Sequence, residues 1–237
     1  NENEYDFRQL ARLIHIINND PDSLEHILDI SSFVQYLAIN ILTGSWDDYR
    51  SNQNNFYLYY QPDIDRFLFI PYDYDNTFGI DWFSIDWDNI DPYSYYLIAD
   101  TDRPLADIIF DNEQYRNLFS RYLRFYIDHI FNISELGGWI DSTIEMIDSS
   151  AYYDTYRTLD YGFTYNDFIN SFSANSYSNQ HVKTGLKEFV INRVSSLEDQ
   201  ITFTEGNPLV YKYWIEPEFP LVGDTITIHA SAYGYPN

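Results

Sequence analysis

One β-hairpin is predicted in the first third of the chain, between segments whose apolar residues recur at helical spacing, and this hairpin constrains the fold most. The segments Phe56–Tyr60 and Arg66–Tyr72 are short and rich in aromatic and branched apolar residues, and the turn sequence Gln61-Pro62-Asp63 separates them. A hairpin returns the chain close to its starting point. The residues that precede the first strand and those that follow the second must therefore lie side by side.

Apolar residues recur at helical spacing on both sides of the hairpin. This spacing predicts helices over residues 7–17, 24–30 and 33–42 before it, and over 105–110, 115–131, 136–149, 167–172 and 182–202 after it. Ser31 or Ser32 is the expected N-cap of the helix at 33–42, and Gly137-Gly138 is predicted to be a turn or helix break. The sequence therefore predicts a mainly α fold of the α+β class.

The character of the sequence changes at about Glu205. The breaker Gly206-Asn207-Pro208 is followed by the apolar segment Leu209–Ile215 and by the period-two alternation of Thr225–His229, both typical of strands. This tail is too short to hold a core of its own. We expect residues 1–204 to form one domain, and residues 205–237 to begin a β-rich module of immunoglobulin-like type.

The charge of the chain is lopsided, with 13 Lys and Arg against 37 Asp and Glu, a net formal charge of −24. Such a field repels nucleic acid and anionic lipid and favours divalent cations and cationic partners, although acidity can also serve solubility alone. The absence of Cys excludes disulfides, thiolate zinc sites and cysteine nucleophiles. No apolar run approaches about 18 residues, so membrane insertion is not expected.

Two polar clusters flank the predicted hairpin. Residues 46–55 precede the first strand, residues 71–79 include the end of the second, and both are rich in Asp and Asn. The hairpin brings these clusters together, and hard oxygen ligands grouped in this way suit Mg²⁺, Mn²⁺ or Ca²⁺. Asp and Asn are also ordinary turn residues, which is the alternative for each cluster taken separately. Protein kinases order their catalytic half in the same way: a loop Asp, an Asn, a hairpin and a second Asp.

The hairpin sequence resembles that of a known family. Residues 55–59 and 67–79, the latter ending in Pro71-Tyr72-Asp73-Tyr74-Asp75-Asn76-Thr77-Phe78-Gly79, resemble the signature of the CotH (spore coat protein H) kinase family, and the resemblance extends over roughly Phe7 to Thr204. It implies an atypical protein-kinase-like C-lobe that transfers phosphate from ATP to a protein acceptor. It also implies a bacterial, extracytoplasmic protein, either secreted, periplasmic or attached to the cell surface beside other modules of the same chain.

The resemblance assigns a role to each candidate residue. Asp47 matches the catalytic-loop Asp, which orients or deprotonates the acceptor hydroxyl. Asn55 and Asp73 match the metal ligands at the nucleotide, with Asp75 in support, and the implied metal is Mg²⁺ or Mn²⁺, with Ca²⁺ as the alternative. Counting six positions from Asp47, as in a kinase catalytic loop, reaches Asn52 instead.

Two assignments therefore have a second candidate: Asn52 for Asn55, and Asp48 for Asp47. A kinase also needs a nucleotide-gripping lobe with a Lys and a paired Glu. Before Asp47 only Arg8 and Arg12 are basic apart from histidine, and no strand-rich lobe is predicted. We therefore expect this stretch alone to bind ATP poorly and to transfer little phosphate. The alternative function is a surface adhesion or scaffold module that kept the fold without the activity.

A long acidic and aromatic loop is predicted between residues 80 and 102. Its acids and tryptophans are Asp81, Trp82, Asp86, Trp87, Asp88 and Asp91. They predict either a second Ca²⁺ site or acceptor-docking surface, or a covering loop whose tryptophans pack onto the helices. Long loops of this kind are often functional, which keeps the first interpretation open.

Overall fold

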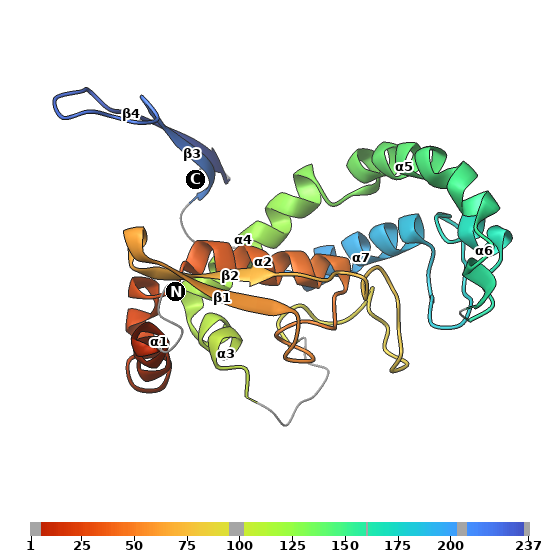
Figure 1. The fold of residues 1–237 in the computed structure, drawn as a ribbon, viewed down its shortest axis with the longest axis horizontal. Coiled ribbons are helices and arrows are strands. Elements are labelled where there is room, and N and C mark those ends of the chain that lie inside the picture. Colours follow the sequence, from red (N-terminus) through yellow and green to blue (C-terminus); the bar gives the residue numbers. More distant parts are fainter. Residues whose placement is uncertain (1–5, 95–101, 160, 203–207, 235–237) are drawn as a thin grey trace.

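The computed structural model describes residues 6–94, 102–159, 161–202 and 208–234, and helices dominate this part of the chain (Figure 1). The α-helices are α1 (Arg8–Asn19), α2 (Ile30–Thr43), α3 (Pro104–Asp111), α4 (Glu113–His129), α5 (Ile133–Tyr153), α6 (Tyr165–Asn170) and α7 (Leu186–Gln200). Two antiparallel hairpins accompany them: β1 (Phe56–Gln61) with β2 (Arg66–Pro71), and β3 (Leu209–Glu216) with β4 (Thr227–Tyr233). Short 3₁₀ turns lie at Pro21–His26, Pro62–Ile64 and Arg157–Leu159. The predicted mainly α, α+β class is confirmed.

Helix α2 is the centre of the core. Its buried residues cover most of its circumference, and it contacts α4, β2 and α7. A helix with so wide an apolar face is stable only when several other elements pack against it. Asp29 caps its N-terminus by accepting a hydrogen bond from the main-chain N–H of Ser32 at 3.2 Å, so the predicted caps at Ser31 and Ser32 are wrong by one turn.

The predicted hairpin is confirmed as β1–β2. Phe56 pairs with Pro71 and Gln61 with Arg66, so the register is regular from end to end. The inner face packs on α2: the ring of Phe69 lies 5.0 Å from that of Phe33 and 4.5 Å from that of Tyr36, between centroids. These aromatic contacts fix the hairpin on α2 and so determine where its open end lies.

The helix predicted over residues 24–30 is instead the 3₁₀ turn Pro21–His26, and α5 and α7 also differ from the sequence pattern. Gly137 and Gly138 lie inside α5 rather than at a break, because glycine lowers helix stability without forbidding the helix and Ile140 anchors this turn in the core. Helix α7 begins at Leu186, four residues later than the apolar pattern predicts. Val182 instead forms an isolated β-bridge with Ile80, which joins the long loop to the start of α7.

The hairpin β3–β4 projects from the helical body (Figure 1). Only its base is packed: Leu209 is buried, the ring of Tyr211 stacks on that of Phe125 in α4 at 4.6 Å, and the hydroxyl of Tyr233 donates to Asp128. The two strands lie where the sequence predicts them. Their membership of an immunoglobulin-like module stays a prediction.

Candidate functional site

Two loops meet at the open end of the β1–β2 hairpin. We name them the Asp47 loop (residues 46–55) and the Asp73 loop (residues 72–79). At their junction the main-chain N–H of Tyr72 donates to the carbonyl oxygen of Asn55 at 3.1 Å, which continues the hairpin pairing by one step. The acids of both loops share one electrostatic environment: the pKa of Asp75 is raised by partial burial, then by Asp73, and also by the charge of Asp47.

Three carboxamides hold the carboxylate of Asp47. The Nδ2 of Asn55 donates to Oδ2 at 2.9 Å and to the main-chain oxygen of Asp47 at 2.8 Å. Asn52 and Asn54 donate to Oδ1 at 2.6 and 3.4 Å. Donors on both oxygens fix the plane of the carboxylate. Asp47 is therefore an oriented anion at the mouth of the hairpin, only partly shielded from solvent.

Asn55 and Asn52, the two candidate metal-side carboxamides, differ in burial. Asn52 is exposed, whereas Asn55 is 8% exposed and contacts both the side chain and the main chain of Asp47. Both of its hydrogen bonds use Nδ2, so its carbonyl oxygen is the atom with which it would face a cation. Its backbone has φ 57°, a left-handed conformation that residues other than glycine rarely adopt. The geometry favours Asn55 over Asn52 for this role.

Asp48 faces the protein interior and is 3% exposed. Its carboxylate accepts hydrogen bonds from the Nδ2 of Asn40 at 2.7 Å and from the main-chain N–H of Ser51 at 2.8 Å. Burial raises the pKa of Asp48, and its hydrogen bonds and Arg50 oppose the shift. An acid in this position organises the loop, and the geometry favours Asp47 over Asp48 as the residue that faces an acceptor.

Asp73 and Asp75 lie exposed on the Asp73 loop. Asp73 has φ 59°, a second left-handed residue beside the hairpin, and its Oδ1 accepts from the main-chain N–H of Asp75 at 3.4 Å. The pKa of the Tyr72 hydroxyl is raised by desolvation, then by Tyr57, and then by the charges of Asp73 and Asp47. That single hydroxyl is close enough to both acids to sense them, so the acids of the two loops lie on one side of the hairpin.

The donor set determines which cation would fit. Within the described residues, no three His, Cys, Asp or Glu side chains are arranged to hold a metal ion by themselves. Mg²⁺ rarely has an all-protein cage; it usually binds one or two carboxylates, and the phosphates of its substrate complete the shell. Asp73, Asp75 and the carbonyl oxygen of Asn55 are oxygen donors of the right type and number for that mode. Metal binding by these residues stays a prediction.

Three buried arginines hold the loops, and sequence reasoning missed them. Each donates to a main-chain carbonyl oxygen: Arg50 to Pro92 at 3.2 Å, Arg103 to Ser51 at 2.8 Å and Arg193 to Ile90 at 2.7 Å. Arginine can satisfy several carbonyls at once because it carries five N–H donors in a rigid plane. The one signal in the sequence was that basic residues are scarce. In a chain with only 13 Lys and Arg, each arginine is a candidate for a structural role.

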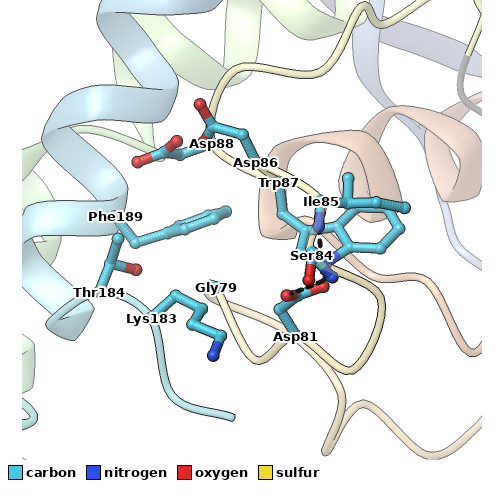
Figure 2. A pocket seen from close by; sticks show the side chains of 10 residues that line it. All are labelled: Gly79, Asp81, Ser84, Ile85, Asp86, Trp87, Asp88, Lys183, Thr184 and Phe189. Atoms are coloured by element: carbon cyan, nitrogen blue, oxygen red, sulfur yellow. Dashed lines mark hydrogen bonds between the residues drawn. The ribbon is translucent and has the colours of Figure 1, made fainter. Parts of the chain in front are cut away.

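A cavity of about 390 Å³ lies between the long loop and the start of α7 (Figure 2). Its lining residues are Gly79, Asp81, Ser84, Ile85, Asp86, Trp87, Asp88, Lys183, Thr184 and Phe189. The Asp81 carboxylate points back into its own loop and accepts from Ser84, Ile85 and the indole of Trp87. Its pKa is raised by burial but lowered more by these hydrogen bonds, with a net decrease.

The two tryptophans of the long loop differ in burial. Trp87 is 2% exposed and packs in the core, as a covering loop requires, whereas Trp82 is 49% exposed and stacks on His181 at 4.3 Å between ring centroids. Trp46 connects this loop to the Asp47 loop, because its Nε1 donates to the carbonyl oxygen of Ile80 at 2.8 Å. A second Ca²⁺ site or acceptor-docking surface in this loop stays a prediction.

Comparisons with known proteins agree on one family. Residues 1–197 match the family described as CotH kinase protein. Three proteins of Rhizopus delemar are similar: "Spore coat protein homolog 1" is 24% identical over 53% of this chain and 21% of its own length, "Invasin CotH7" 23% over 56% and 23%, and "Invasin CotH3" 34% over 24% and 10%.

The matched segments are short relative to these fungal proteins, of which the chain covers at most 23%. Among the helices of the described segments, none is long and apolar enough to cross a membrane. A bacterial origin stays a prediction. The family match covers most of the chain, including both loops and the hairpin between them, and the chain therefore belongs to the CotH kinase protein family.

Proposed function

We propose that this chain is the metal-binding and catalytic half of a protein kinase of the CotH type, which transfers the γ-phosphoryl group of ATP to a hydroxyl of a protein acceptor. One observation carries the proposal. Asp47, Asn55 and Asp73 stand at the open end of one hairpin, and Asn55 both orients Asp47 and keeps a carbonyl oxygen for a cation. Kinases need this combination of an anion for the acceptor and oxygen ligands for the nucleotide metal.

Asp47 has the role of orienting and deprotonating the acceptor. The acceptor oxygen forms a bond to the γ-phosphorus while the bond from that phosphorus to the β–γ bridging oxygen breaks, and ADP leaves. The hydroxyl proton goes to the carboxylate of Asp47. Asp73, Asp75 and Asn55 would hold Mg²⁺ or Mn²⁺, which supplies positive charge to the phosphate oxygens. The carboxamides around Asp47 hold its carboxylate in a fixed orientation for the acceptor.

Two features support an active site rather than an inactive scaffold. The first is the set of donors on Asp47, which an adhesion module would have no need to maintain. The second is the left-handed backbone at Asn55 and Asp73, which turns the main chain sharply at two residues that still carry an oxygen ligand. We further propose an extracytoplasmic location, supported by relatives that are named as a spore coat protein homologue and as invasins.

The experiment measures phosphate transfer and metal binding separately. Labelling of an acceptor from ATP is measured with the longest natural protein that contains this sequence, because residues 1–237 alone are expected to transfer little. Asp47→Ala and Asp73→Ala should each lower labelling at least about a hundredfold. Asp63→Ala, which removes an exposed acid at the far end of the same hairpin, is the matched control and should leave labelling unchanged.

Mn²⁺ titration followed by electron paramagnetic resonance on the 237-residue chain tests the site itself. We expect Asp73→Ala to weaken Mn²⁺ binding and Asp63→Ala to leave it as in the wild type. Labelling that survives Asp73→Ala in a folded protein would refute the assignment of the metal site. Labelling that survives Asp47→Ala would refute the role of Asp47 alone.

A further inference from the structure

A buried carboxamide on α2 connects the two loops of the candidate site. Asn40 is 1% exposed and lies in the last turn of α2. Its Nδ2 donates to the Oδ2 of Asp48 at 2.7 Å, and its Oδ1 accepts from the hydroxyl of Tyr74 at 3.0 Å. Asp48 directly follows Asp47, and Tyr74 directly follows Asp73. One side chain therefore bonds the sequence neighbour of each acid.

The chemistry fixes the direction of both hydrogen bonds. A carboxylate only accepts, so the NH₂ group of Asn40 faces Asp48, and its carbonyl oxygen is left for Tyr74, whose hydroxyl must then donate. Aspartate at position 40 would bring two carboxylates to hydrogen-bond distance. Leucine has nearly the same shape but would bond neither Asp48 nor Tyr74. The buried carboxylate of Asp48 would then lose one of its donors, which destabilises the fold.

A main-chain contact also joins α2 to the Asp73 loop, but it does not reach the part of the loop that carries the acids. The N–H of Phe78 donates to the carbonyl oxygen of Thr43 at 2.7 Å, which ties the end of the Asp73 loop to the end of α2. That contact lies beyond the acids. Tyr74 stands between Asp73 and Asp75 in the sequence, so the position of its hydroxyl constrains the backbone that carries both.

We propose that Asn40 is a positioning residue, which sets the Asp73 loop against the Asp47 loop by bonding Tyr74 and Asp48 at the same time. Its effect on metal binding rests on the proposed function, whereas the coupling of the two loops does not. The side chain touches neither acceptor nor nucleotide. It acts through the residues next to the acids.

Hydrogen exchange followed by mass spectrometry on the whole chain tests the coupling without any ligand. Tyr74→Phe removes one hydroxyl and should keep the fold. Because Asn40 joins the loops, this variant should raise exchange in residues 46–55 as well as in residues 72–79, and Asn40→Leu should raise both further. Tyr59→Phe, on the exposed face of the hairpin, is the matched control and should raise neither. Faster exchange confined to residues 72–79, or absent, overturns the proposal.

Mn²⁺ affinity gives a readout that a merely structural role would not move. In folded variants we expect Tyr74→Phe to weaken binding about tenfold, as is usual when a residue that supports a ligand is lost, and Asn40→Leu at least as much. The double variant should bind no more weakly than Asn40→Leu, because both changes cut one path. Additive losses, or wild-type affinity in Tyr74→Phe, contradict the proposal. A wild-type chain that binds no Mn²⁺ refutes the metal site of the proposed function, and the exchange result then decides the role of Asn40.

Discussion

At the scale of single residues, carboxamides hold the acids of the Asp47 loop: Asn55 donates to Asp47, and Asn40 donates to Asp48. The places of Asp47, Asn55 and Asp73 around the hairpin were predictable from the sequence, whereas their roles stay predictions. The choice between Asn52 and Asn55 was not predictable, because the path of the loop depends on left-handed residues such as Gln53 (φ 58°). The sequence has no glycine there that would indicate such a turn. The burial of Asp48 was equally hidden, since its partner Asn40 lies on a helix face that is otherwise apolar.

The pair Asp86 and Asp88 gives a prediction at the same scale. The hydrogen bond that protonated Asp86 donates to the Asp88 carboxylate, followed by burial and by the charge of Asp88, raises the pKa of Asp86 to about 6, and Arg193 opposes the shift. Asp81 and Lys183 line the same cavity. A carboxyl group with a higher pKa in the folded state holds its proton more tightly there, so its ionisation destabilises the fold. The contribution of Asp86 to the free energy of unfolding should therefore fall as pH rises from about 4, the ordinary pKa of Asp, to about 6.

Asp86→Asn should remove this part of the pH dependence. Urea unfolding between pH 4 and pH 7 measures it, and the variant should gain stability relative to the wild type toward neutral pH. An equal slope in both proteins would show that the two carboxyl groups do not share a proton.

At the scale of elements, the β1–β2 hairpin was predictable because the turn sequence and the two strand patterns beside it favour the same structure. The beginning of α7 was not, because the apolar pattern continues through residues that pair with Ile80 instead. Gly137 and Gly138 show the same limit in reverse: local propensity argues for a break, and packing of α5 overrides it. Tertiary contacts decide where propensities are weak.

The packing of the hairpin yields a prediction for one ring. Phe69 is buried and touches Phe33, Tyr36, Tyr49 and Phe56, so it joins the hairpin to α2 and to the Asp47 loop. Phe69→Ala should lower the free energy of unfolding by about 3–5 kcal/mol. Tyr59→Ala, on the exposed face of the same hairpin, should change it by less than about 0.5 kcal/mol. Equal losses in urea unfolding would contradict the role of the inner face.

At the scale of the whole molecule, the chain consists of a helical body and a projecting hairpin (Figure 1). The family match ends at residue 197, close to the end of α7, and the sequence predicts a boundary at about residue 205. The hairpin β3–β4 touches the body mainly through α4. The body therefore contains every residue of the candidate site.

This separation predicts that a chain ending at Thr202 unfolds in one cooperative transition. It loses the buried side chain of Leu209 and the aromatic contacts of Tyr211 with α4, a loss of about 2–3 kcal/mol. Calorimetry should record a midpoint lower by about 4–12 °C. A truncated chain without a cooperative transition would mean that the hairpin belongs to the fold of the body.

The left-handed backbone at Asn55 and Asp73 has a consequence for how homologous sequences evolve. Glycine adopts that conformation freely, so a lineage that keeps only the fold can replace both residues and relax the main chain. A lineage that still needs oxygen ligands at these points must keep Asn and Asp, the non-glycine residues that adopt this conformation most readily. Glycine at both positions would therefore distinguish inactive homologues of this fold from active ones, even where the rest of the hairpin is unchanged.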